Sequence, residues 1–583
     1  MRTFLSLPSS RLLAHAHVTC IHGLPHLNSH VRLASSAVAA VRRGSSSHDR
    51  DIRPPRAFAG LGLSKFVSIG LTSAFPHIKD ATEAQKEFIP ALIGGKDVLL
   101  KGRTGSGKSF GLVLAILSRY RDIQPQERAS VTLLLVPHRD LAFQFLHWIE
   151  RVWQAAAPSW PLHSIAQVLV RGSSDTSAQV ELLHTHRPKI VIGTPQAVFD
   201  VLEANPLALN LRQVSAIVVD EADYLIDHVP SEASKVSRQK AEQKMRRHPS
   251  ATNQLLDRVF AQRIARTRGM AADMKRPRGE DAPERDTLPQ LVMCSATFHS
   301  GLRQALYGSG WFRKGEGSMV KVKGQTSASD ALLFDSGQED DASVLGGRDI
   351  QHCVLVVSED GDVKNIDGAV EAAPSAELED DLKASVVEAV FTSPDAALPE
   401  LSEEEIQRFS MTPSPFHPAL MEGIATAFAV DVPRIALLVL PASAPVHRAV
   451  YDLRMLGVHA HGLDLLASDR GRAHLLRGEA HGAASAPPTL LVSTLASTRG
   501  LDLPALTHVF VLGVPEGRRV DGYVHVAGRV GRCGRGGKVV SVVEARHDVE
   551  GADGQVYTKD EPGQMLRILS TLGVAATKYE SFY

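Results

Sequence analysis

Two short segments of this 583-residue chain combine residue types that suit phosphate chemistry. The first, residues 102–109, reads Gly-Arg-Thr-Gly-Ser-Gly-Lys-Ser and follows the apolar run 97–100. Glycines let backbone N–H groups close around phosphate oxygens, and the helix expected after the loop adds its dipole. Lys108 is placed to reach the β- and γ-phosphates of a nucleotide, and the Ser109 hydroxyl to bind Mg²⁺. The residues expected around the phosphates are Arg103, Thr104, Gly105, Ser106, Gly107, Lys108 and Ser109.

The second segment, residues 218–223, reads Val-Val-Asp-Glu-Ala-Asp. Acids that follow an apolar strand lie at its carboxyl end, where open α/β sheets bind their ligands. Asp220 fits a carboxylate that holds Mg²⁺, partly through water, and Glu221 fits a group that orients or deprotonates the attacking water. Together the two segments predict a nucleotide-hydrolysing site with Mg²⁺ as a ligand and Lys108, Asp220 and Glu221 as catalytic residues.

The elements that must position these residues alternate along the chain. Short apolar runs bounded by Gly, Pro or Asp are followed by amphipathic stretches, which predicts βαβ units and parallel sheets. Two series of such runs predict an α/β fold with two parallel-sheet domains in tandem. The predicted strands are 97–100, 131–136, 189–192, 216–219 and 290–293, then one near 350, 435–440, 489–492, 508–512 and 538–542.

Composition excludes several other classes of protein. Hydrophobic residues make up 44% and charged residues 22% of the chain, a balance typical of globular domains. The four cysteines lie far apart without a CxxC pair, which disfavours a disulfide framework or a structural zinc site. No apolar run is long enough to span a bilayer, so no membrane insertion is expected.

The N-terminal segment, residues 1–48, holds five arginines and no acidic residue. A segment rich in Arg and Ser and free of acids is typical of a mitochondrial transit peptide, and it predicts location in the mitochondrial matrix. A disordered basic tail is the alternative interpretation.

Two polar stretches interrupt the pattern. Residues 229–287 carry 14 basic and 8 acidic residues, and residues 359–405 carry 15 acidic and two basic residues. Both are interpreted as solvated insertions or linkers and not as core. The basic insertion is also a candidate for an additional contact with nucleic-acid phosphates.

Further segments occur in the order found in one family. Residues 220–223 and 102–109, together with six other segments, resemble the motifs of DEAD-box ATP-dependent RNA helicases. In layout the chain most resembles fungal mitochondrial members, including one that acts in assembly of the large mitochondrial ribosomal subunit. The other segments are similar to the Q motif (81–85), motif Ia (137–144), motif Ib (193–195), motif III (295–297), motif V (494–502) and motif VI (525–532).

The resemblance implies a helicase core of superfamily 2, with two RecA-like domains that close on ATP and RNA. It implies residues 58–325 as the first domain, 326–349 as a linker and 350–583 as the second. The implied adenine and ribose contacts are Phe58, Gln85 and Asp502, and the implied arginine fingers are Arg529 and Arg532. The implied RNA contacts are Arg139, Thr194 and Arg499, and the implied coupling residues are Ser295, Thr297 and His525.

The chain departs from the family pattern at Val526, Leu495 and the pair Gln196-Ala197. These departures predict that ATP hydrolysis is retained while RNA contacts or domain coupling are weaker than in the family. The expected function is an ATP-dependent RNA helicase or RNA chaperone of mitochondrial RNA, with mitochondrial ribosomal RNA or ribosome precursors as partners. An ATP-gated RNA clamp that unwinds little is the alternative, and a DNA translocase is a more distant one.

Overall fold

The structure, a computed structural model, describes residues 58–120, 130–156, 161–229, 235–267, 288–315, 317–323, 350–371, 401–432, 434–463, 488–503, 506–515, 520–531, 536–550 and 555–582. The predicted transit peptide (1–48), the predicted linker (326–349) and Arg532 lie outside these residues. No helix within the described ranges is long and apolar enough to cross a bilayer.

The first domain is built on a parallel sheet, which has seven strands in the described residues and the order β3-β4-β2-β5-β6-β1-β7. The register pairs Lys101 with Ser295 and Val219 with Met293, so β1, β5 and β6 end at one edge. The phosphate loop and residues 220–223 therefore meet at this edge. The strands are β1 (Asp97–Lys101), β2 (Val131–Leu135), β3 (Ala166–Leu169), β4 (Ile190–Gly193), β5 (Val214–Val219), β6 (Gln290–Ser295) and β7 (Met319–Lys323).

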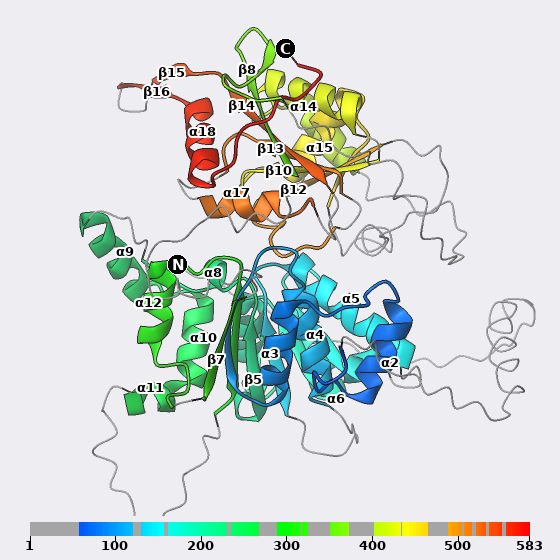
Figure 1. The fold of residues 1–583 in the computed structure, drawn as a ribbon, viewed down its shortest axis with the longest axis vertical. Coiled ribbons are helices and arrows are strands. Elements are labelled where there is room, and N and C mark those ends of the chain that lie inside the picture. Colours follow the sequence, from blue (N-terminus) through cyan, green and yellow to red (C-terminus); the bar gives the residue numbers. More distant parts are fainter. Residues whose placement is uncertain are drawn as a thin grey trace, which may run out of the picture. The chain divides into compact units, whose positions relative to one another are not determined.

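Helices cover both faces of this sheet because successive residues of a strand point to opposite faces. Val98 and Leu100 of β1 pack in one cluster with α2 to α5, and Leu99 packs in another with α7, α10 and α12. Figure 1 shows α3 and α4 on one side of this sheet and α10 and α12 on the other. The helices are α2 (Lys65–Ala74), α3 (Glu83–Ile93), α4 (Lys108–Ser118), α5 (Arg139–Ala156), α6 (Thr176–His186), α7 (Pro195–Ala204), α8 (Ala222–Leu225), α9 (Lys235–Arg247), α10 (Ala251–Val259), α11 (Ala261–Thr267) and α12 (Ser300–Ser309), with 3-10 turns at Leu162–Ser164 and Leu211–Gln213.

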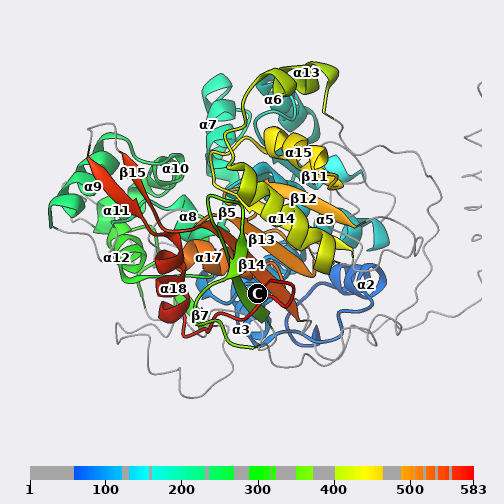
Figure 2. The same cartoon turned by 90° about the horizontal axis from the view of Figure 1, so that it is seen from above.

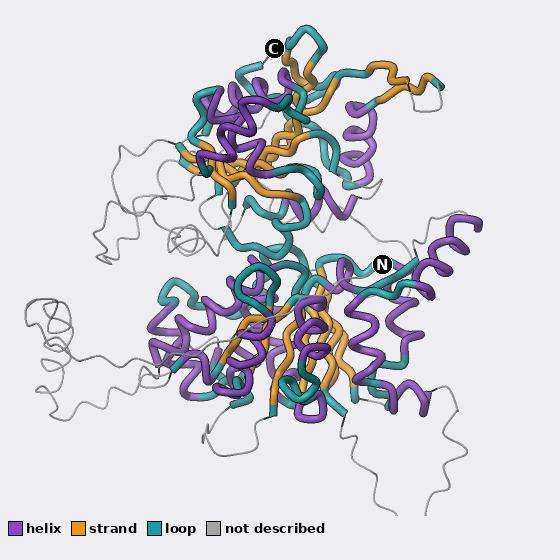
Figure 3. The backbone as a smooth tube through the Cα atoms, turned by 180° about the vertical axis from the view of Figure 1, so that it is seen from behind, coloured by secondary structure: helices purple, strands orange, loops and turns teal. Residues whose placement is uncertain are grey.

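The second domain also combines strands with helices (Figure 3). Its strand order is β11-β12-β10-β13-β14-β8-β9. All its neighbouring strands are parallel except the pair β8 and β9. The strands are β8 (Ile350–Val357), β9 (Val363–Asn365), β10 (Ile435–Leu440), β11 (Ala460–Gly462), β12 (Thr489–Thr494), β13 (His508–Leu512) and β14 (Gly537–Glu544), and β15 (His547–Glu550) and β16 (Val556–Lys559) form a separate hairpin.

The helices of the second domain also divide between two faces. Residues of α14 and α15 pack with Leu438 and Phe510 on one face (Figure 2), while residues of α17 and α18 pack with Val509 on the other. The prediction of two parallel-sheet α/β domains is therefore confirmed. The helices are α13 (Glu403–Met411), α14 (Pro418–Asp431), α15 (Val446–Met455), α17 (Val520–Ala527) and α18 (Glu561–Thr571).

The prediction that residues 229–287 lie outside the core is wrong for the part that forms α10 and α11. Leu255, Leu256 and Phe260 are buried against the sheet of the first domain, because their spacing gives this short helix one apolar face. The Ser250 hydroxyl caps α10 by accepting from the Asn253 N–H at 3.2 Å. Among the helices described within residues 229–287, α9 alone has no buried residue.

The acidic stretch 359–405 was likewise predicted to lie outside the core, and its described beginning contradicts this. Residues Val363–Asn365 form β9, which pairs antiparallel with β8 at the edge of the sheet. Ile366 is buried behind it. An edge strand of three residues with Lys364 at its centre is too short to show the alternation of apolar and polar residues by which a strand is recognised in sequence.

The core role of α10 and α11 is testable by a large-to-small substitution. Phe260→Ala should lower the free energy of unfolding of the first domain by about 3–5 kcal/mol, because it removes a fully buried ring. Val236→Ala on α9 is the control and should change it by less than about 0.5 kcal/mol, because Val236 is 61% exposed. Chemical denaturation measures both, and equal effects would contradict the assignment.

Candidate nucleotide site and its contacts with the second domain

The phosphate loop leaves β1 and turns directly into α4. Gly105 and Gly107 adopt left-handed backbone angles, with φ of 78° and 75°, which residues with a Cβ adopt at a cost. The Lys108 ammonium is buried inside the loop and donates to the Gly102 and Arg103 carbonyls. This cradle of backbone and lysine at a helix N-terminus fits a nucleotide phosphate group.

Gln85, predicted to contact adenine, braces the loop from α3. Its Oε1 accepts from the Thr82 N–H at 3.0 Å, and its Nε2 donates to the Gly107 carbonyl at 3.0 Å. Thr82 caps α3 and also donates from its hydroxyl to the Ser106 carbonyl at 3.1 Å. Phe58, the other predicted adenine contact, is 2% exposed and packs in the apolar core. The adenine roles of Gln85 and Phe58 stay predictions.

The carboxylate after β5 lies beside the phosphate loop. The Ser109 hydroxyl donates to Asp220 Oδ2 at 2.7 Å. Burial, and next the neighbouring charge of Glu221, raise the pKa of Asp220 to about 6. A buried carboxylate beside a hydroxyl is a hard-oxygen donor set of the kind that Mg²⁺ prefers, so these two residues fit the ion they were predicted to hold.

Asp223 is the point where four functional segments meet. One carboxylate oxygen accepts from the Ser295 hydroxyl at 2.6 Å. The other accepts from the Thr297 hydroxyl at 3.2 Å, Arg499 Nη1 at 3.0 Å and His525 Nε2 at 3.1 Å. Burial alone would raise the pKa of Asp223, but the contacts of His525, Arg499 and Ser295 outweigh it and hold this pKa far below its usual range.

Arg529 is braced within the second domain. Its side chain is 1% exposed, and it donates from Nε to the His525 carbonyl at 2.9 Å and from Nη1 to the Leu501 carbonyl. It therefore ties the turn of residues 499–502 to α17. Its role as an arginine finger stays a prediction, and its predicted companion, Arg532, lies outside the described residues.

The turn after α17 packs tightly on the phosphate loop. A Cβ added at Gly528 would lie 1.9 Å from Thr104 Oγ1. Among the described residues, Thr104 Oγ1, Glu221 Oε2 and His525 Nδ1 are buried without a hydrogen-bond partner, and the last two lie 3.6 Å apart. Unsatisfied polar atoms on both sides of this contact fit a polar ligand and water between them.

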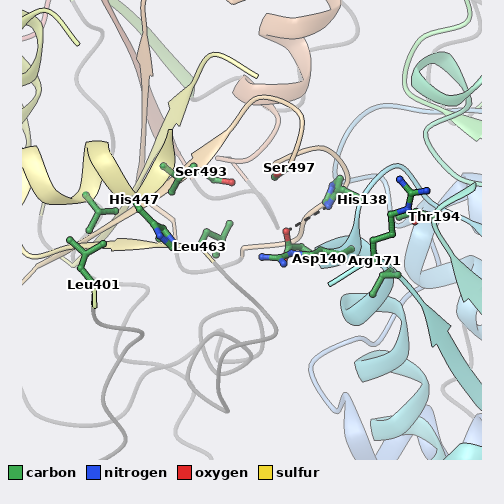
Figure 4. Close-up of a pocket in the computed structure, with 14 residues that line it drawn as sticks. His138, Asp140, Arg171, Thr194, Leu401, His447, Leu463, Ser493 and Ser497 are labelled. Carbon is green, nitrogen blue, oxygen red and sulfur yellow. Dashed lines mark ion pairs between the residues drawn. The ribbon is translucent and has the colours of Figure 1, made fainter. Parts of the chain in front are cut away.

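A cleft of about 470 Å³ lies beside this network (Figure 4). Of the residues predicted to contact RNA, Arg139 and Thr194 line it. Arg499 does not, because its guanidinium binds Asp223 and lies 5.0 Å from the ring centroid of Tyr224. Asp502, predicted to reach the ribose, donates its backbone N–H to Gln144 Oε1 at 2.7 Å.

Four residues that the sequence analysis did not select belong to this site: His138, Gln144, Arg171 and Asp223. Asp223 is the last acid of the segment 218–223, so a further carboxylate after the strand was a usable signal. Arg171 lines the cleft but donates twice to Asp200, at 2.5 and 2.7 Å. Its pairing depends on the turn after β3, a strand that the sequence pattern did not predict because Gln167 interrupts its apolar residues.

Tandem RecA-like domains with a phosphate loop and carboxylates at neighbouring strand ends form a site suited to a nucleoside triphosphate. Two family models match the chain, "DEAD/DEAH box helicase" over residues 82–305 and "Helicase conserved C-terminal domain" over residues 475–534. Over these residues the chain is similar to the DEAD/DEAH box helicases and to the helicase C-terminal domain.

Curated relatives match most of the chain at low identity. The chain is 26% identical to the ATP-dependent RNA helicase mak5 of Aspergillus terreus over 85% of its own length and 56% of that protein. It is 25% identical to mak5 of Aspergillus oryzae over 83% of its length and 54% of that protein. The chain thus spans about half the length of the curated relatives it matches.

Two solved structures share the fold at 16% identity. Mss116p bound to ssRNA and AMP-PNP matches with a TM-score of 0.54, over 91% of this chain and 80% of that one. S. cerevisiae Dbp5 bound to RNA and ADP BeF3 matches with a TM-score of 0.50, over 90% of this chain and 95% of that one.

The prediction of a mitochondrial location is wrong. The relatives that match most of the chain are Mak5 helicases, a nucleolar group of ribosome biogenesis and not a mitochondrial one. The acid-free, arginine-rich composition of residues 1–48 carried that prediction, and basic segments of this composition also occur without a role in import.

The roles of Lys108 and Glu221 lead to opposite expectations for two variants. Lys108→Ala should abolish ATP binding, because it removes the cation within the phosphate loop. Glu221→Gln should keep ATP binding and stall hydrolysis, because the carboxylate that orients water is lost while its shape remains. Fluorescent-nucleotide binding and phosphate release measure the two steps. Hydrolysis by Glu221→Gln at the parental rate would contradict the assignment.

The close contact of Gly528 with Thr104 leads to a second expectation. Gly528→Ala should leave ATP binding to the first domain intact but lower RNA-stimulated hydrolysis by at least about tenfold, because the added methyl group holds the domains apart. Adding Thr104→Gly removes the atoms it would strike and should restore part of the rate. A Gly528→Ala variant with the parental rate would show that the contact is not used in turnover.

Proposed function

We propose that this protein is an ATP-dependent RNA helicase or RNA chaperone that acts on ribosomal RNA during ribosome biogenesis. The observation that carries the proposal is the Asp223 network, which joins segments of both domains beside a cleft lined by Arg139 and Thr194. The ribosomal assignment rests on the Mak5 relatives.

In ATP hydrolysis each polar side chain of the nucleotide site has its own role. Lys108 binds phosphate, Ser109 and Asp220 hold Mg²⁺, and Glu221 orients or deprotonates water. Bound Mg²⁺ would offset phosphate charge during hydrolysis. Because the first domain supplies these groups and α17 closes over them, hydrolysis depends on contact between the two domains.

The RNA half of the proposal rests on the cleft. Arg139 and Thr194 come from the first domain, and Ser493 and Ser497 come from the second, so one strand contacting both would favour the closed arrangement (Figure 4). Contacts of this type read backbone shape and charge and not sequence. Binding a bent strand across both domains would separate a short duplex locally.

The alternative, an ATP-gated RNA clamp, is favoured by one observation. Val526 stands where the family has arginine, and it is fully buried in the apolar core, so this position offers RNA no cation. Single-turnover duplex separation compared with ATP-dependent RNA retention distinguishes the two. Retention without separation would support the clamp.

Nucleic-acid specificity is the direct test of the proposed function. RNA should stimulate ATP hydrolysis, and DNA of the same sequence should not, with a coupled phosphate-release assay as the readout. Glu221→Gln is the control for contaminating ATPases. Equal stimulation by DNA would support a DNA translocase, and no stimulation by either would contradict both assignments.

The helix α9 is proposed as an additional RNA contact. It is a polar helix whose cations are all exposed or half-buried at the surface: Lys235, Arg238, Lys240, Lys244, Arg246 and Arg247. The segment that follows its C-terminal end is held near residues 220–223 by two hydrogen bonds. The Ser250 N–H donates to Asp227 at 2.5 Å, and the Asp227 N–H donates to Asn253 at 3.1 Å. These six exposed cations suit phosphates outside the cleft.

Replacing these cations with Gln should weaken RNA binding and flatten its salt dependence, while ATP affinity stays unchanged. Removing one phosphate contact should reduce the slope of log affinity against log salt by about 0.7 for a single strand. A control variant replaces Ser237, Gln239 and Gln243 on the same helix with Ala and should keep the parental slope. An unchanged slope in the Gln variant would leave α9 without a role in RNA binding.

A further inference from the structure

We propose that His138 is a positioning residue that latches the second domain onto the first when the helicase closes. This role deepens the proposed function and rests on it. It concerns the step between RNA binding and hydrolysis, and not the phosphate chemistry. His138 stands just before α5 in the first domain, and its ring reaches the backbone of residue 499 in the second.

The hydrogen bonds of the ring define its protonation state. His138 Nε2 lies 2.6 Å from the Arg499 carbonyl oxygen, which can only accept, so Nε2 carries the proton. The Leu141 N–H, which can only donate, points at Nδ1 from 3.3 Å. Both ring nitrogens are therefore matched in one neutral tautomer, and one ring joins the start of α5 to the second domain.

The latch continues along α5. Gln144 Nε2 donates to the Gly500 carbonyl at 3.3 Å, and Gln144 Oε1 accepts from the Asp502 N–H at 2.7 Å. Gly500 itself has a φ of 71°, and a Cβ at this position would lie 2.6 Å from Leu141 Cδ2. His138, just before α5, and Leu141 and Gln144 within it thus hold the backbone of residues 499–502.

This contact holds Arg499 at both of its ends. The carbonyl accepts from His138, while the guanidinium donates to Asp223 at 3.0 Å. His138 and Ser497 also line the cleft proposed for RNA (Figure 4). A strand in the cleft would therefore stabilise the turn that delivers Arg499 to the carboxylate beside the nucleotide site.

The surroundings of the ring keep it neutral. Burial, together with the positive charges of Arg529, Arg499 and Arg139, lowers the pKa of His138 to about 4 despite the contact with the Arg499 carbonyl. The Asp140 carboxylate is 4.0 Å from Nδ1, beyond hydrogen-bond distance. The ring is therefore neutral at neutral pH, and protonation does not compete with its hydrogen bond to the Arg499 carbonyl in the closed arrangement.

The test compares two substitutions in the full-length chain. His138→Leu keeps bulk but removes both hydrogen-bonding atoms, whereas His138→Gln keeps an amide that can donate to the Arg499 carbonyl. His184→Leu is a matched control, because His184 is a histidine of α6 bonded to Asn205. The readouts are kcat and KM with saturating RNA, ATP affinity, melting temperature and energy transfer between dyes at exposed positions 182 and 430.

His138→Leu should lower the RNA-stimulated kcat about five- to tenfold and reduce the change in energy transfer on adding an ATP analogue and RNA. ATP affinity and melting temperature should stay near parental values. His138→Gln should recover most of the lost rate, and His184→Leu should lose none. A His138→Leu variant with parental kcat and a parental change in energy transfer would overturn the latch.

Equal losses in His138→Leu and His138→Gln would also overturn it, because the donor would then be irrelevant. Should His138→Leu unfold, the comparison of His138→Gln with a third variant, Gln144→Leu, replaces it. That variant removes both Gln144 bonds and should show the same loss of kcat. If RNA does not stimulate the parental protein, the proposed function fails. The change in energy transfer on adding the ATP analogue alone then tests the latch separately.

Discussion

The buried carboxylate of Asp223 is the constraint on which the rest of the site depends. A charge removed from water must be paired and hydrogen-bonded, or its burial is strongly destabilising. The pairing here comes from Ser295 and Thr297 in the first domain and from Arg499 and His525 in the second. The closed arrangement supplies the Arg499 cation and the His525 hydrogen-bond partner, so closure satisfies an electrostatic demand of the first domain.

The two sheets link the surroundings of Asp223 to the nucleotide site and to the cleft. Parallel register brings the ends of β1, β5 and β6 to one edge, so the phosphate loop, Asp220 and Ser295 are neighbours although they come from distant parts of the chain. In the second domain, Arg529 ties the turn of residues 499–502 to α17. A shift of residues 499–502 or of α17 therefore moves the side chains near the nucleotide site and those near the cleft at the same time.

Much of the fold was predictable from sequence because long apolar strands are buried on both faces. The strands β10 and β13 have the bounds expected, whereas β3, β7 and β11 were missed because Gln, Lys or His interrupts their apolar residues. Residues 251–267 were misassigned because the charges on their solvent face hid the apolar stripe of Leu255, Leu256 and Phe260.

The site was predictable where chemistry demands a local motif. Residues 102–109 and 220–221 are such motifs, and the structure brings them together with Ser295, Thr297 and His525. His138 and Gln144 could not be assigned, because their partners are backbone atoms more than 350 residues away. Backbone partners leave no signature in sequence.

A double-mutant cycle of Asp223→Asn and Arg499→Met tests the central claim most directly. If the two residues act through one ion pair that couples the domains, their effects on RNA-stimulated kcat/KM will not add. The double variant should be about as impaired as the worse single variant, with a coupling energy of about 0.5–3 kcal/mol. Losses that simply multiply would show that Asp223 and Arg499 act independently and would contradict the account.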